Sequence, residues 1–253
     1  MATQVRRQLH AIVWTLTIAV VALEIPYPLV HGHARNVLTI ATVLVFALAS
    51  LAHASTYGSA RRALVLLLVV GGGGFAAEAI GVHTGYPFGR YHYTGGLGAS
   101  VAGVPLIIPL AWVMMAHPAA SVARRIVDGR AAAVIVATMA LATWDVFLDP
   151  QMVAARHWRW SDPSTHLPGV DNVPLSNFGG WLLVALVLLA TLLLVTRSEP
   201  MHDDRPALAL WLWTWLSSTL ANLAFFGRPA VAGWGFLAMG VVGLPLLVRL
   251  ARR

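Results

Sequence analysis

Residues 177–196 read NFGGWLLVALVLLATLLLVT, and this run holds no charged side chain and no proline. A helix needs about 20 mostly apolar residues to cross the hydrocarbon core of a bilayer. The run reaches that length on its own, so it predicts a membrane-spanning helix. The rest of the chain is best understood by asking whether other runs repeat this pattern.

The overall composition also indicates a membrane protein. The chain has 253 residues, of which 58% are hydrophobic and 11% charged, whereas soluble domains carry about 25% charged residues. This balance excludes intrinsic disorder and a soluble nucleic-acid binder. Cysteine is absent, which excludes a disulfide scaffold, a thiolate metal site and a cysteine nucleophile. Every basic residue is Arg, and the lack of Lys argues against Schiff-base chemistry and a Walker-type phosphate loop.

Apolar runs recur along the whole chain, separated by segments that carry proline, glycine and charge. They fall at residues 9–25, 37–53, 63–80, 101–117, 131–148, 177–196, 207–226 and 230–250. The first run lacks a convincing small-residue cleavage site and is followed by more spans, so we interpret it as an uncleaved helix. The sequence therefore predicts an all-α polytopic membrane helix bundle of about eight transmembrane helices, forming a single integral membrane domain over residues 1–253.

The arginines provide a test of this topology. If the N-terminus is cytoplasmic, twelve arginines fall in the inner segments: Arg6, Arg7, Arg61, Arg62, Arg124, Arg125, Arg130, Arg197, Arg205, Arg249, Arg252 and Arg253. Five fall in the outer segments: Arg35, Arg90, Arg156, Arg159 and Arg228. This excess on one side follows the positive-inside rule. It predicts a multi-pass protein of the cell membrane with both termini in the cytoplasm.

Several polar residues lie where the bilayer makes them costly, at roughly 2.5–3.5 kcal/mol for each charged group. They fall at the outer ends of five predicted helices and comprise Glu24, Glu78, Asp145, Asp149, Asn177 and Asn222. Polar side chains from five helices thus converge on one side of the membrane. We take this convergence as the candidate functional site.

Asp145 and Asp149 form the sharpest signal, within the run WDVFLDP at residues 144–150. Their i, i+4 spacing places both carboxyl groups on one helix face. Two carboxylates close together in a low dielectric do not both ionise easily, so the pair is expected to retain a proton. A retained proton is what a general acid needs. The alternative is that Asp149 caps a new turn that begins at Pro150, with only Asp145 inside.

The other acids allow both structural and functional interpretations. Glu78 continues a stripe with Gly71 and Gly74, which predicts that it lies on a close-packed helix face rather than toward lipid. A purely structural buried glutamate is the alternative. Glu24 can instead lie in the headgroup region, and Asn222 can instead form an interhelical hydrogen bond.

Aromatic residues gather in two outer loops and along one helix. Residues 81–94 hold three of the five tyrosines, and residues 157–181 follow the acid-bearing helix with a Trp-Arg-Trp triplet. Anchoring by an aromatic belt explains part of this enrichment. The seventh predicted helix carries a stripe that suits a long flat hydrocarbon or, alternatively, ordinary helix packing: Trp211, Trp215, Ser218 and Asn222. Histidines show no metal-binding spacing, so no metal site is expected.

These motifs resemble the carotenoid hydratase family of bisanhydrobacterioruberin type. The resemblance covers roughly residues 75–185 and rests on Glu78, TGYPFGRYHYT at 84–94, GVPL at 103–106, PLAW at 109–112, WDVFLDP at 144–150, WRW at 158–160, and VPLSN at 173–177 with Gly180 and Trp181. Two positions depart from the expected glycines, namely His157 and Asn172. These departures concern loop detail and substrate choice.

The resemblance implies an integral membrane enzyme that adds water to the terminal double bond of an acyclic carotenoid end and forms a tertiary alcohol. The implied substrates are acyclic or monocyclic carotenoids of forty or fifty carbons, and no cofactor is expected. Membrane lipid and other carotenoid enzymes are the implied partners, and nucleic acid is not.

Such chemistry assigns roles to the candidate residues. Protonation of the terminal alkene gives a tertiary carbocation, so Asp145 or Asp149 is expected to donate the proton, and the other carboxylate with Glu78 to stabilise the cation. Asn177 is expected to hold the attacking water. The predicted substrate contacts, some of them through cation–π faces, are Tyr91, Tyr93, Trp144, Phe88, Trp181, Trp215, Asn222 and Glu24.

Three other functions fit parts of the pattern. A carotenoid cyclase shares the protonation step, but a neighbouring alkene captures the cation. A UbiA-type membrane prenyltransferase has a motif similar to Asp145-x-x-x-Asp149, yet needs a second such motif, and Asp203-Asp204 is expected on the opposite membrane face. A transporter or pigment-binding protein can use converging acids as a proton relay.

Overall fold

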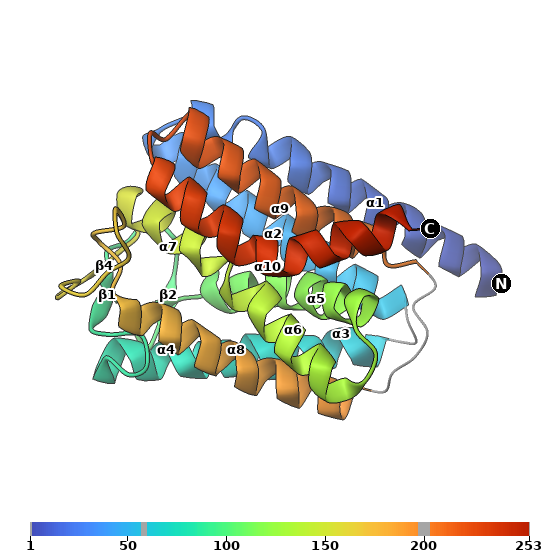
Figure 1. Ribbon diagram of the computed structural model, residues 1–253. Coiled ribbons are helices and arrows are strands. Elements are labelled where there is room, and N and C mark those ends of the chain that lie inside the picture. Colours follow the sequence, from blue (N-terminus) through green and yellow to red (C-terminus); the bar gives the residue numbers. More distant parts are fainter. Residues whose placement is uncertain (1, 57–59, 197–202, 253) are drawn as a thin grey trace.

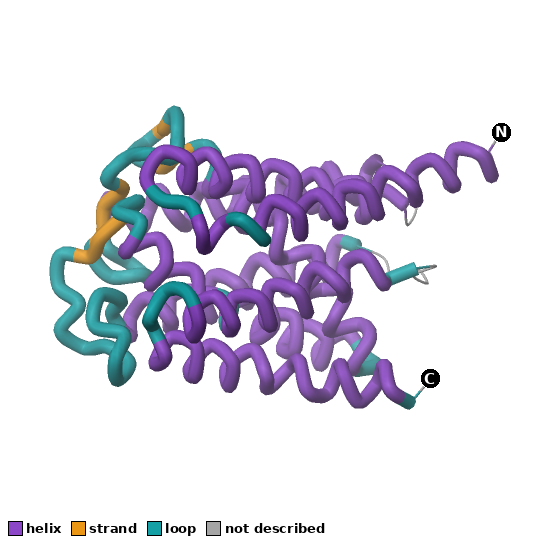
Figure 2. The backbone as a smooth tube through the Cα atoms, turned by 90° about the horizontal axis from the view of Figure 1, so that it is seen from above, coloured by secondary structure: helices purple, strands orange, loops and turns teal. Residues whose placement is uncertain are grey.

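The computed structural model describes residues 2–56, 60–196 and 203–252. Long helices lie alongside one another, and all the short strands gather at one end of the bundle (Figures 1 and 2). The start of α1 (Ala2–Glu24) and the end of α10 (Pro229–Ala251) lie at the other end. Both ends of the chain are therefore on one side of the bundle. Their location in the cytoplasm stays a prediction, and Arg197 and Arg253 of the predicted inner set lie outside the described residues.

The described helices follow the predicted runs in order and form eight segments. These are α1; α2 (Gly32–Thr56); α3 (Ala60–Leu66) with the π-helix η2 (Leu67–Gly72) and α4 (Gly73–Thr84); α5 (Ile108–Ile126); α6 (Arg130–Ala142) with α7 (Asp145–Ala154); α8 (Leu175–Val195); α9 (Arg205–Ala224); and α10. A short 3-10 turn, η1 (Tyr27–Leu29), follows α1. The all-α architecture is confirmed.

Six of these segments are long and apolar enough to cross a bilayer: residues 8–29, 32–56, 60–84, 130–154, 175–195 and 229–251. The two that fall short are α5 and α9. Most residues of α5 are buried, because this helix contacts α2, α6 and α9. A helix enclosed by other helices needs less hydrophobicity than one that faces lipid. The structure supports a membrane bundle, and the number of eight crossings stays a prediction.

The largest boundary error concerns the predicted span at 101–117. Residues 100–105 instead form a hairpin of β2 (Ser100–Val101) and β3 (Val104–Pro105), and α5 begins only at Ile108. The two turn residues, Ala102 and Gly103, both have positive φ, as a tight two-residue hairpin turn requires. Pro109 falls in the first helical turn, where a missing N–H costs nothing.

The glycine-rich stretch 71–74 packs the third segment closely against its neighbours. A Cβ on Gly71 would lie 3.2 Å from Val113 of α5, and a Cβ on Gly74 would lie 2.8 Å from the ring of Trp112. A Cβ on Gly73 would collide with Leu188 of α8. This confirms the predicted close-packed face, which continues one turn further to Glu78.

The two aromatic loops meet in a small antiparallel sheet. The strands β1 (Tyr91–Tyr93) and β4 (Trp158–Trp160) pair Tyr91 with Trp160 and Tyr93 with Trp158. Side chains alternate between the two faces of a strand, so these four rings share one face, toward the bundle interior. His92 and Arg159 are exposed on the other face. The sheet thus carries aromatic rings from two distant segments to the same end of the bundle.

Candidate active site

A cavity of about 490 Å³ lies among helices α1, α2, α4, α5, α7, α8 and α9 and the aromatic face of the β1–β4 sheet. Its polar lining includes Glu24, Glu78, Asp149, Asn177 and Asn222. Its aromatic lining includes Phe88, Tyr91, Tyr93, Trp144 and Trp181. Pockets that bind small ligands are mostly apolar with a few convergent polar groups. Ten of the twelve residues predicted for the site therefore line one cavity of that kind.

Asp145 and Asp149 lie on one face of α7 and are joined by a residue of α8. The Asn177 side-chain nitrogen Nδ2 donates to Asp145 Oδ2 at 2.7 Å and also to Asp149 Oδ2. Asn177 lies in the first turn of α8, so this single amide fixes the start of one helix against the other. The predicted shared face of the two aspartates is confirmed by this arrangement.

The alternative in which Asp149 caps a turn beginning at Pro150 is wrong. The helix α7 begins at Asp145 and continues through Pro150 to Ala154. Asp149 is thus inside the helix, and its second oxygen, Oδ1, accepts a hydrogen bond from Trp158 Nε1 at 3.0 Å. Asp149 is engaged by α8 and by β4 instead of by the backbone of a new turn.

The two aspartates differ in their surroundings. Asp149 lines the cavity, whereas Asp145 does not and is fully buried behind it. Asp145 Oδ1 receives no hydrogen bond from an N–H or O–H group of the described residues. A buried carboxylate oxygen without a donor is costly unless it carries a proton. One carboxyl group therefore faces the cavity, and the other stands directly behind it.

Glu78 is held by three donors from two parts of the chain. Tyr91 and Tyr93 of β1 donate to its oxygen Oε2 at 2.5 Å and 2.8 Å. Trp112 of α5 donates through Nε1 to Oε1 at 3.1 Å. Hydrogen bonds to a charged group are stronger than those between neutral groups. Both carboxyl oxygens of Glu78 therefore accept hydrogen bonds, and the side chain is held in one position.

The two tyrosines lie outside the membrane-spanning segments, and both keep their protons. Burial, followed by the nearby charge of Glu78, raises the pKa of Tyr91 and of Tyr93 well above the usual range. Because a phenol with a raised pKa remains protonated at neutral pH, both residues act as donors toward Glu78 and not as anions.

Glycines allow these donors to approach. Gly74 is one turn before Glu78, and its missing side chain leaves room for the Trp112 ring. Gly81 has the same role for β1, because a Cβ there would lie 3.0 Å from the Tyr91 hydroxyl and 2.8 Å from Phe88. The local sequence of α4 thus combines one acid with two positions that only a small residue fills.

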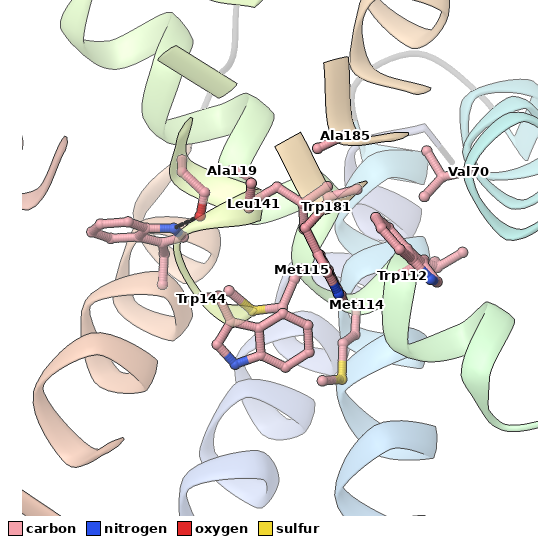
Figure 3. Close-up of a cluster of buried hydrophobic side chains, with 14 of the residues drawn as sticks. Val70, Trp112, Met114, Met115, Ala119, Leu141, Trp144, Trp181 and Ala185 are labelled. Carbon is pink, nitrogen blue, oxygen red and sulfur yellow. Dashed lines mark hydrogen bonds between the residues drawn. The ribbon is translucent and has the colours of Figure 1, made fainter. Parts of the chain in front are cut away.

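Tryptophans form an aromatic wall next to the carboxyl groups. Trp112 and Trp181 stack with their ring centroids 4.0 Å apart, and Trp144 meets Trp181 edge to face at 6.0 Å (Figure 3). The three rings come from α5, α8 and the residue just before α7. Indole faces attract cations, so the wall presents a surface that favours positive charge in the cavity.

A second set of polar residues lines the part of the cavity near α1 and α9. Trp213 of α9 donates through Nε1 to Glu24 Oε2 at 2.7 Å, which places Glu24 against protein rather than only in the headgroup region. Asn222 donates through Nδ2 to Ser218 O within its own helix, and its oxygen Oδ1 is buried without a partner among the described residues. The interhelical hydrogen bond suggested for Asn222 is therefore not among the bonds of the described residues.

Comparison with known proteins identifies the family. The family model for carotenoid biosynthesis proteins matches residues 34–248, which is most of the chain. The chain belongs to the carotenoid biosynthesis protein family. The family resemblance inferred from the sequence motifs is thereby confirmed.

One curated protein is directly similar to this chain. Bisanhydrobacterioruberin hydratase from Haloarcula japonica is 32% identical over 192 residues. The match covers 70% of this chain and 64% of that relative, so the chain spans less than two thirds of the relative's length. No solved structure shows a significant match to the chain.

Trp215, one of the predicted substrate contacts, does not line the cavity of this chain. Its ring stacks on Phe236 with centroids 5.2 Å apart, and its Nε1 donates to Phe236 O at 3.1 Å. Gly243 of α10 has no room for a side chain because this ring fills the space. The stripe from Trp211 therefore divides: its first half packs against α6 and α10, and only Ser218 and Asn222 reach the cavity.

Several functional candidates were missed by sequence reasoning. Trp112 and Trp158 donate to Glu78 and Asp149, yet no role was predicted for either, although both belong to the motifs that carry the family resemblance. Trp213 was missed entirely, because it lies beside the stripe of Trp211 and Trp215 and not on it. Spacing along one helix gives no signal for a contact with α1.

The second acidic pair, Asp203 and Asp204, was considered as a possible metal-binding motif. Within residues 2–56, 60–196 and 203–252, no three His, Cys, Asp or Glu side chains form a group that could hold a metal ion. Asp203 is 2.7 Å from Arg205, and Asp204 is 3.2 Å from Arg125. Both aspartates of the second acidic pair are thus engaged in ion pairs. The absence of a metal site stays a prediction.

Proposed function

We propose that this chain is a carotenoid hydratase, which adds water to the terminal double bond of an acyclic carotenoid end and forms a tertiary alcohol. The observation that carries the proposal is the pair Asp145 and Asp149, which the Asn177 amide bridges and of which Asp149 lines a tryptophan-walled, largely apolar cavity. A polyene end fits such a cavity, and its protonation requires a strong acid there. The similarity to bisanhydrobacterioruberin hydratase supports the same chemistry.

In the first step, the aspartate pair supplies a proton. Asp145 Oδ1, which receives no donor from the part of the chain that the structure describes, stores the proton, and the neighbouring Asp149 carries it to the cavity. The two carboxyl groups are within hydrogen-bonding reach of each other. Transfer to the less substituted carbon of the terminal alkene breaks the π bond, forms a C–H bond and leaves a tertiary carbocation. The aspartate pair has then lost one proton.

The carbocation is stabilised by charge and by aromatic faces. Glu78 interacts electrostatically with both aspartates, and its three donors keep its carboxylate fixed. A preorganised anion at the point where positive charge develops lowers the barrier without reorganisation. The stacked pair Trp112–Trp181 adds a cation–π surface.

Water completes the addition. Both hydrogens of the Asn177 amide are used by Asp145 and Asp149, so Asn177 contacts water only through its carbonyl oxygen, which accepts a hydrogen bond. The water oxygen attacks the carbocation and forms the C–O bond, and one water proton returns to the aspartate pair. The net change is one water added to one double bond, with the acid restored.

Expression in a host that makes acyclic carotenoids tests this proposal. Extracted pigments should contain products heavier by one or two water molecules, with the hydroxyl on the terminal tertiary carbon. Pigments of unchanged mass but new ring structure would show a cyclase instead. A product enlarged by a prenyl unit in a magnesium-dependent reaction would show a prenyltransferase. Bound or transported pigment without any new product would refute an enzymatic function for this chain.

A further inference from the structure

The cavity reaches the surface in one region of its lining. Among the described lining residues, four are more than half exposed: Ile25 at 60%, Leu29 at 65%, Leu220 at 58% and Phe225 at 53%. Ile25 directly follows α1 and Leu29 is the last residue of η1, whereas Leu220 lies in the last turns of α9 and Phe225 directly follows it. The opening therefore lies between these two segments, which run next to each other (Figure 1).

The walls of this opening are tied together inside the bundle. Glu24 is the last residue of α1, and Trp213 of α9 donates to it at 2.7 Å. Both residues line the cavity. This contact holds the end of α1 at a fixed distance from α9, so the opening is a formed feature of the fold and not a gap between unconnected helices.

The surface around the opening is apolar. All four exposed lining residues are hydrocarbon or aromatic, and the neighbouring exposed residues of α9 are Leu216 at 49% and Leu223 at 61%. A continuous exposed apolar surface on a membrane bundle faces the acyl chains of lipid. The opening therefore connects the carboxyl groups with the hydrocarbon of the bilayer.

Charged groups mark the water-facing side of the same opening. The guanidinium of Arg35 lies 5.6 Å from the ring centroid of Tyr27 and 5.4 Å from that of Phe226, and the guanidinium of Arg228 lies 5.3 Å from Phe226. Tyr27 and Phe226 are themselves lining residues. Arginines and aromatic rings collect at the level of the headgroups. Cationic side chains thus cover this side, and the apolar side stays uncovered.

We infer that the opening between residues 25–29 and 220–225 is a lateral membrane entrance, which admits a long linear hydrocarbon and holds its unreacted part during turnover. A cavity of about 490 Å³ suits a drug-sized ligand, whereas an extended forty-carbon polyene is much longer. Only the reacting end fits inside, and the rest projects through the opening into lipid. The identity of this hydrocarbon as a carotenoid rests on the proposed function.

The natural lack of cysteine makes a precise test possible. Leu220→Cys places a single thiol at the opening, and a bulky maleimide then blocks it after the protein has folded and been reconstituted. Leu216→Cys, one turn earlier on α9 and outside the cavity lining, is the matched control. Hydration is measured with a long acyclic carotenoid and with a short acyclic isoprenoid that has the same terminal alkene.

The inference predicts that labelling Leu220→Cys slows hydration of the long substrate by about tenfold or more, which corresponds to at least about 1.4 kcal/mol in the barrier. Hydration of the short substrate, which does not project through the opening during turnover, should fall less than hydration of the long one, and the rates of labelled Leu216→Cys should change by less than about twofold. An unchanged long-substrate rate at full labelling, or an equal loss in labelled Leu216→Cys, would overturn the inference.

Uptake of pigment separates this inference from the proposed function. If the unlabelled chain hydrates neither substrate, the hydratase proposal fails, but the entrance is still tested by the absorbance of long carotenoid retained on purified protein. Labelled Leu220→Cys should then retain less pigment than labelled Leu216→Cys. Equal retention by the two labelled proteins would overturn the entrance independently of any catalysis.

Discussion

Asn177 Nδ2 lies 2.7 Å from Asp145 Oδ2, and this contact joins the first turn of α8 to the first turn of α7. The same amide donates to Asp149. The spacing of the two aspartates along α7 would place them side by side in any helix. Their common donor comes from a segment 28 residues beyond Asp149, so it ties both carboxyl groups to the start of α8.

Replacing either aspartate with its amide should abolish proton donation. Asp149→Asn and Asp145→Asn are each expected to lower the hydration rate by about 100-fold or more, since general acid catalysis contributes about 10²–10⁴-fold. The product is measured by mass spectrometry of pigments, with membrane insertion followed by immunoblot. Asp162→Asn changes an exposed loop acid and serves as the control. Full activity in both site variants would exclude the pair as the acid.

The two tyrosines that donate to Glu78 should matter more for the hydration rate than the third tyrosine of residues 81–94. Tyr91→Phe and Tyr93→Phe each remove one hydrogen bond to a carboxylate, worth about 1.5–3 kcal/mol, so the hydration rate should fall by about 10- to 100-fold. Tyr86→Phe lies in the same loop, but Tyr86 is 66% exposed, and it should keep the original rate. Equal rates in all three variants would indicate that Glu78 has a structural role only.

The close approach of α5 to α4 should depend on a missing side chain. Gly74→Ala places a Cβ 2.8 Å from the Trp112 ring, and relieving that contact should reduce the free energy of unfolding by about 1–3 kcal/mol. The hydration rate should fall with it, because Trp112 then no longer reaches Glu78. Gly72→Ala has open space around its Cβ and should be neutral or stabilising by up to about 1 kcal/mol. Thermal unfolding in detergent compares the two variants.

Neighbouring tryptophans of α9 should behave differently. Trp215 packs against Phe236 outside the cavity, so Trp215→Phe is expected to cost about 1–3 kcal/mol of stability without changing the rate per folded molecule. Trp213 lines the cavity and donates to Glu24, so Trp213→Phe should lower hydration of a long substrate. The hydration rate of each variant is measured per folded molecule. A loss of rate in Trp215→Phe with an unchanged rate in Trp213→Phe would contradict the placement of both rings.

Local sequence patterns were sufficient for the features that depend on a single helix. The long apolar runs predicted the membrane bundle, because a bilayer demands length and hydrophobicity from each crossing segment. The spacing of Asp145 and Asp149 placed two carboxyl groups on one face, and the stripe of Gly71, Gly74 and Glu78 predicted a close-packed face. Each of these features follows from helical periodicity, which the sequence determines alone.

Only the tertiary structure decided which of these faces meet. Asn177, Trp158 and Trp112 reach the carboxyl groups from other segments, and Trp215 lies on a suitable stripe but turns toward α10 instead of the cavity. The physical reason is that periodicity specifies the direction of a side chain relative to its own helix, whereas its partner depends on how neighbouring helices pack and on the pairing of β1 with β4. The sequence by itself determined a membrane helix bundle with acids on particular helix faces. The packing of distant segments determined which acid faces the cavity and where that cavity opens.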